Sequence, residues 1–135
     1  MFSLNDFDES ESSPTAGARE IPMEREFQRA RDLRESGELA ESLSLLRRVL
    51  DVRKRELGLE QDDTQFAASQ LGRTLRAMGR FDEALRLHEK VLALRLGHYG
   101  RAHSFTQNSV RILAKTYRMA GREGHARIVE ARHLE

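Results

Sequence analysis

The chain has 135 residues, a length typical of one domain, with 39% apolar residues, 33% charged residues and a net charge of +1. It has no cysteine, which excludes disulfides and thiolate chemistry. It also lacks an apolar run of about 18 residues and a basic N-terminus ahead of an apolar segment, so the sequence predicts neither a membrane span nor a secretory signal. We therefore expect a cytoplasmic protein.

Residues 1–22 differ in charge from the rest of the chain. They hold five acids against Arg19, a net charge of −4, so the remaining residues carry +5. Serines, proline and glycine among these acids favour solvated coil, and we predict a disordered acidic tail over residues 1–22. The tail is either a solvated leader or an intramolecular ligand, whose candidate residues are Leu4, Asp6, Phe7, Asp8 and Glu9.

A repeat of 42 residues organises the rest of the chain. Its clearest marks are three equally spaced glycines, Gly37, Gly79 and Gly121. Glycine at such a position ends a helix and allows the backbone conformation that turns the chain back. A small residue follows each glycine five positions later, where it lets the next helix approach closely: Ser42, Ala84 and Ala126.

The apolar residues between these glycines recur in steps of three and four, which indicates amphipathic helices. We predict six helices, paired into repeats at about 23–64, 65–106 and 107–135, within one domain over residues 23–135. Thr64 and Thr106 are expected to be N-caps of their helices. The helices are placed near residues 23–36, 39–57, 64–78, 81–98, 106–120 and 122–134.

In the second repeat, Leu71-Gly72, Leu75, Gly79, Phe81 and Ala84 follow an order of large, small, large, glycine, aromatic and alanine residues. With this order the repeat resembles the tetratricopeptide repeat. The 42-residue period and the connectors at 57–64 and 99–106 are similar to those of kinesin-light-chain-type repeats. Arg29 departs from the pattern, because a large apolar residue is usual there. The resemblance implies an all-α, right-handed solenoid of stacked helix pairs, whose first helices line a concave groove.

Catalytic and metal chemistry find no support in the sequence. His98 and His103 lack a cysteine or an acid at a known ligand spacing, so no metal site is predicted. His88 is interpreted as a hydrogen-bonded histidine packed between helices. No phosphate-binding loop or nucleophile elbow is present. We therefore predict no enzymatic activity and no cofactor.

If the family geometry holds, basic residues recur along the groove with the repeat period. A first basic row consists of Arg31, Arg73 and Lys115, and a second basic row of Arg34, Arg76 and Arg118. Phe27 and Phe66 would add apolar contacts. The other groove-facing positions are expected to be Glu24, Ser69, Asn108 and Arg111.

These residues predict a protein-interaction adaptor that binds an acidic segment with a hydrophobic anchor, regulated by its own acidic tail. Guanidinium groups suit this ligand because they bind carboxylates through two parallel hydrogen bonds. Two alternatives stay open. One is nucleic-acid binding through the arginine-rich groove. The other is self-assembly, because Ile128, Val129 and Leu134 of the last helix would be partly exposed.

Overall fold

A computed structural model describes residues 20–135, so the predictions made for residues 2–9 lie outside the described residues. The described part forms six α-helices and contains no strand. They are α1 (Glu24–Glu35), α2 (Leu39–Glu56), α3 (Asp62–Ala77), α4 (Phe81–Tyr99), α5 (Ser104–Met119) and α6 (Glu123–His133). None of these helices is both long and apolar enough to cross a membrane.

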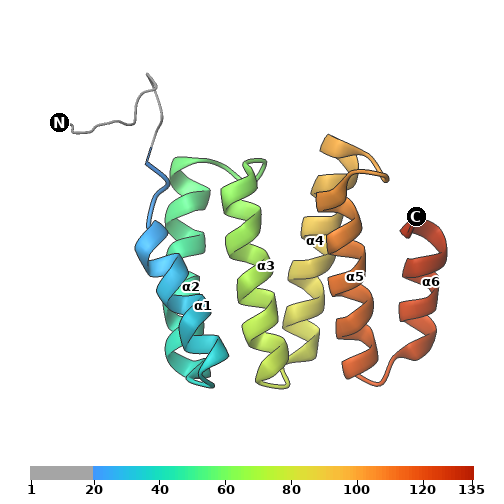
Figure 1. The fold of residues 1–135 in the computed structure, drawn as a ribbon, viewed down its shortest axis with the longest axis horizontal. Coiled ribbons are helices and arrows are strands. Elements are labelled where there is room, and N and C mark those ends of the chain that lie inside the picture. The colour runs from blue at the N-terminus through green and yellow to red at the C-terminus, as the bar shows by residue number, and fades with distance from the viewer. Residues whose placement is uncertain (1–19) are drawn as a thin grey trace.

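The helices stand side by side in chain order and form a short α-solenoid (Figure 1). Each helix packs against the next in sequence, and α1 also contacts α3 directly. The first helices of the three pairs, α1, α3 and α5, therefore lie on one side of the stack. We call this surface the α1/α3/α5 face.

Glycine turns join the two helices of each pair, as the repeat predicted. Gly37, Gly79 and Gly121 have φ values of 84°, 78° and 78°, in the left-handed region that strains residues with a side chain. The small residue that follows each turn is fully buried: Ser42, Ala84 and Ala126 are 0% exposed. This confirms the close approach inferred for the second helix of each pair.

Two core clusters run through the stack. One joins the first two pairs around Leu46, Val49 and Leu71, and the other joins α4, α5 and α6 around Leu92 and Leu113. Side chains every three or four residues supply both clusters, so the amphipathic pattern accounts for the way the helices pack.

The N-cap prediction for the two threonines is wrong. α3 and α5 begin two residues earlier, with Gln61 and His103 as N-caps. Thr64 and Thr106 lie inside their helices, where each buried hydroxyl donates at 3.3 Å to the carbonyl of an arginine on the preceding helix. The recurring threonine thus links two helices instead of capping one.

Candidate functional site

The second basic row connects neighbouring repeats. Arg34 on α1 donates a hydrogen bond to the Gln70 side chain on α3. Arg76, 42 residues later on α3, donates to the Thr116 hydroxyl on α5 at 3.1 Å. Both arginines are half-buried, and both use a neutral acceptor on the first helix of the next repeat. The row therefore has a structural role in its first two members, and neither of them forms an ion pair within residues 20–135.

The third member of this row, Arg118, is neutralised. Its two terminal nitrogens lie 2.7 and 2.6 Å from the two carboxylate oxygens of Glu130, and its Nε lies 3.0 Å from Glu123. The bonds to Glu130 and Glu123 raise the pKa of Arg118. This residue therefore adds little net charge to the α1/α3/α5 face, contrary to the prediction of a continuous row.

Four of the arginines on α1 and α3 lie near one another and have no acidic partner among the described residues. Within residues 20–135, Arg31, Arg34, Arg73 and Arg76 form no ion pair. Burial lowers the pKa of Arg34, and Arg73, Arg31 and Arg76 lower it further against the opposing effect of Glu35. Burial followed by Arg73 also lowers the pKa of Arg76. Arg34 is thus repelled by the other three groups and Arg76 by Arg73, and we call these four residues the arginine cluster.

The electric field of the arginine cluster extends to His88 on α4. The imidazole is 2% exposed and packs against the backbone of α3 at Gly72. Burial, followed by Arg76 and Arg73, lowers the pKa of His88 to about 3, so the ring is neutral at pH 7. His88 lies between helices as expected, and its Nε2 has no hydrogen-bond partner within residues 20–135.

The expected apolar contacts of the site need correction. Phe27 is 7% exposed and belongs to the core, with its ring 4.6 Å from the Arg53 guanidinium carbon. Phe66 is half-buried against the edge of Phe105 and lies below Arg95. Ser69 is also buried. The family geometry taken from the resemblance assigned these residues to the groove, whereas core and groove positions adjoin on the same helix.

On α5, the remaining predicted positions are open to solvent. Asn108, Arg111 and Lys115 are all exposed. They form no ion pair within the described part of the chain. Arg111 and Lys115 extend the positive character of the face onto α5, but the charges that lower the pKa values of Arg34, Arg76 and His88 lie on α1 and α3.

Two buried arginines form connections that the sequence did not reveal. Arg53 is 1% exposed and donates to the carbonyls of Pro22 and Asp63 and to the carboxylate of Glu24. Arg95 is 2% exposed and donates to Gln65, Ser109 and the carbonyl of Phe105. Arg53 and Arg95 occupy the same position of the 42-residue repeat, which could have indicated a shared structural role. Because arginine is usually exposed, this repetition alone did not indicate burial.

Comparisons with known proteins agree with this geometry. The family model of the tetratricopeptide repeat matches residues 25–97 and again residues 63–135, together more than half of the chain. The chain belongs to the tetratricopeptide repeat family. Proteins of this family generally mediate protein–protein interactions, and the described residues hold no group of three or more side chains suited to a metal ion.

Solved structures give the same fold for this tetratricopeptide repeat protein. Two crystal structures of nearly identical TPR-like repeats of a kinesin light chain from Podosopora anserina, the second a variant of the first, match with TM-scores of 0.74 and 0.75. Sequence identity is 23% and 24%, over 84% and 87% of this chain. The chain spans less than two thirds of those structures, 57% and 59% of their length. A search of curated proteins finds no significant match.

Proposed function

We propose that this tetratricopeptide repeat domain binds an acidic segment of a partner protein across the α1/α3/α5 face, with the arginine cluster as the centre of the site. The observation that supports this most strongly is that Arg34 lies within electrostatic range of Arg31, Arg73 and Arg76, while none of the four forms an ion pair within residues 20–135.

The arginine cluster differs from Arg118 in the third repeat, which is paired with two glutamates. Gathering like charges costs free energy, and the lowered pKa values of Arg34 and Arg76 reflect part of that cost. In the third repeat, Glu130 and Glu123 remove the cost at Arg118. A bound carboxylate would do the same for the cluster, because a guanidinium binds carboxylates with two parallel bonds.

The test is the affinity of a fluorescein-labelled peptide of alternating Glu and Gly, measured by fluorescence polarisation. Replacing Arg31 and Arg73 together with Ala should weaken binding at least about tenfold, which corresponds to about 1.4 kcal/mol. These two residues are chosen because Arg34 and Arg76 also connect repeats.

The matched control replaces Arg47 and Arg48 with Ala. Both are exposed on α2, outside the α1/α3/α5 face, and the control removes the same two charges. Equal loss in both variants, with helicity unchanged by circular dichroism, would show a nonspecific charge effect and contradict the proposal. Tighter binding of a random oligonucleotide than of the peptide would instead favour the nucleic-acid alternative.

We further propose that the acidic tail competes for this site. Residues 2–9 combine Phe7 with Asp6, Asp8 and Glu9, and a tether gives such a segment an effective concentration of about a millimolar. Deleting residues 1–19 should therefore tighten binding of the Glu-Gly peptide. Unchanged affinity would mean that the tail does not regulate the site.

A further inference from the structure

The hydrogen-bonding capacity of the arginine cluster is largely unused within residues 20–135. A guanidinium carries five N–H donors. Arg34 directs one to Gln70, Arg76 one to Thr116, and Arg31 a long one of 3.4 Å to Gln28. The Nε of Arg31 is buried and has no partner among the described residues. Most donors are therefore left for a ligand.

Arg118 shows how this fold satisfies a single guanidinium. It engages both oxygens of Glu130 and, through Nε, the carboxylate of Glu123, so one arginine meets two carboxylates. The four arginines of the cluster call for more negative charge at one point than a single carboxylate supplies. A phosphate monoester brings a charge of about −1.5 to −2 and three acceptor oxygens in one group.

We infer that the arginine cluster binds a phosphorylated serine or threonine of the partner segment. The inference rests on the proposed function and defines its ligand more closely. Two guanidinium groups, one from α1 and one from α3, would each form paired hydrogen bonds to phosphate oxygens. The remaining two would compensate charge from their half-buried positions. Phosphorylation of the partner would then control its recruitment.

The test uses three fluorescein-labelled peptides with Glu-Gly flanks and a central phosphoserine, aspartate or serine. We expect the phosphoserine peptide to bind at least about tenfold more tightly than the aspartate peptide, and the serine peptide to bind most weakly. Equal affinity for phosphoserine and aspartate would overturn the inference and leave the proposed function standing. Failure of all three to bind would overturn both.

Two double substitutions test which residues cause the preference for phosphoserine over aspartate. Arg31→Lys with Arg73→Lys keeps the charge but loses the planar donor geometry, and should reduce the phosphoserine-to-aspartate ratio severalfold. Arg111→Ala with Lys115→Ala removes two exposed charges from α5 and should leave the ratio unchanged while weakening both peptides. A ratio that falls only in the α5 variant would place the phosphate elsewhere and contradict the inference.

The pH dependence gives an independent readout. The second ionisation of a phosphate monoester has a pKa of about 6, so affinity for the phosphoserine peptide should rise between pH 5 and 7.5. The aspartate peptide is already ionised over this range. Among the described residues, Glu35 acts on Arg34 of the cluster, and the adjacent His88 is neutral because its pKa of about 3 lies below the range. Parallel pH profiles for the two peptides would contradict the inference.

Discussion

At the scale of single residues, the two buried arginines, Arg53 and Arg95, each donate three hydrogen bonds from nearly inaccessible side chains. Arg95 donates three hydrogen bonds and lies 5.5 and 5.2 Å from the rings of Phe66 and Phe105. Truncating it leaves buried acceptors such as Gln65 and Ser109 without their donor. We expect Arg95→Ala to lower the free energy of unfolding by about 3 kcal/mol, measured by urea denaturation.

The matched control for this prediction is Arg86→Ala on the exposed side of α4, which should change stability by no more than about 0.5 kcal/mol. Arg95→Lys should not restore the loss, because one ammonium group cannot reach three separate acceptors in the geometry of a guanidinium. Equal urea midpoints for the Arg95 and Arg86 variants would show that the buried bonds contribute nothing measurable.

His88 predicts a specific pH dependence of stability. Its folded pKa of about 3 lies below the value of about 6.5 for a free imidazole, so between these values the unfolded chain binds a proton that the native state excludes. The contribution of the neutral His88 to the free energy of unfolding is complete above pH 6.5. It is lost as the pH falls below that value, by up to about 1.4 kcal/mol per pH unit. His88→Leu, which copies Leu46 one repeat earlier, should flatten the unfolding free energy between pH 6.5 and 4.5. Identical pH profiles for the two proteins would contradict this.

The burial of individual residues was the weakest part of the sequence prediction. Phe27 was expected in the groove and Arg53 was not expected to be buried, yet both are buried and they pack on each other. Whether a side chain on the boundary of an amphipathic face turns toward the core or the groove depends on its neighbours on other helices. A single helix pattern does not contain that information.

At the scale of elements, Gly79 and Gly97 have different roles: one is required by a turn, and the other lies inside a helix. Gly79 ends the α3–α4 turn at a φ of 78°, whereas Gly97 lies inside α4 with open space where a side chain would project. Gly79→Ala should destabilise the fold by about 1 kcal/mol, and Gly97→Ala should stabilise it by about 0.5–1 kcal/mol. Thermal unfolding followed by circular dichroism measures both, and shifts of the same sign would contradict the assignment of the turn.

Helix number, order and approximate bounds followed from the sequence, because the 42-residue period fixed the glycine turns. α1 forms at residues 24–35 despite Arg29, which lies on the exposed outer side of the stack. The starts of α3 and α5 were misplaced because a threonine before an apolar run resembles an N-cap. Its partner, a carbonyl on the preceding helix, becomes visible only in three dimensions.

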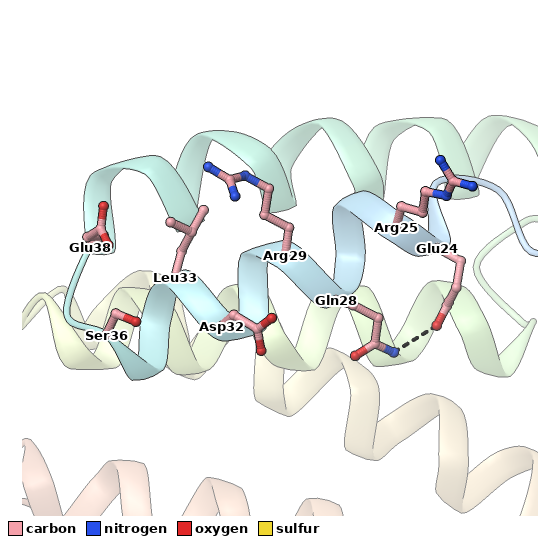
Figure 2. A pocket seen from close by; sticks show the side chains of 8 residues that line it. All are labelled: Glu24, Arg25, Gln28, Arg29, Asp32, Leu33, Ser36 and Glu38. Carbon is pink, nitrogen blue, oxygen red and sulfur yellow. Dashed lines mark hydrogen bonds between the residues drawn. The ribbon is translucent and has the colours of Figure 1, made fainter.

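At the scale of the whole molecule, the outer side of α1 carries polar residues at repeat positions that are apolar in the second repeat. Arg25 and Arg29 are in phase with Ala67 and Leu71, which belong to the core. They line a cavity of about 580 Å³ together with Asp32 and other polar residues of α1, and extend toward α2 (Figure 2). Stacking another copy here would bury these charges, which costs free energy.

End-to-end self-assembly is therefore disfavoured through this surface, and we expect a monomer. Sedimentation velocity can be measured from about 5 to about 200 µM protein, a range that reveals micromolar association. The sedimentation coefficient should not change with concentration. A coefficient that rises with concentration would revive self-assembly, with the cleft between α4 and α6 beside exposed Ile128 as the surface to mutate.

The candidate site was predictable in part. The 42-residue period, combined with the geometry of the resembled family, identified Arg31, Arg34, Arg73 and Arg76, and the structure brings Arg34 within range of the other three. It could not show that the third repeat differs, because Glu130 lies at the position of His88 and Leu46, and only packing brings it onto Arg118. Net charge at a surface depends on such pairings, which a count of basic residues omits.

The most direct test of the account is to observe the arginine side chains themselves while an acidic peptide binds. Nitrogen–proton correlation spectra resolve the Nε–H groups of arginines, and a Glu-Gly peptide can be titrated into the labelled protein. The account predicts that the signals of Arg31, Arg34, Arg73 and Arg76 shift together while those of Arg47 and Arg48 on α2 stay in place. Shifts confined to α2, α4 or α6, or spread evenly over all arginines, would contradict a binding site on the α1/α3/α5 face.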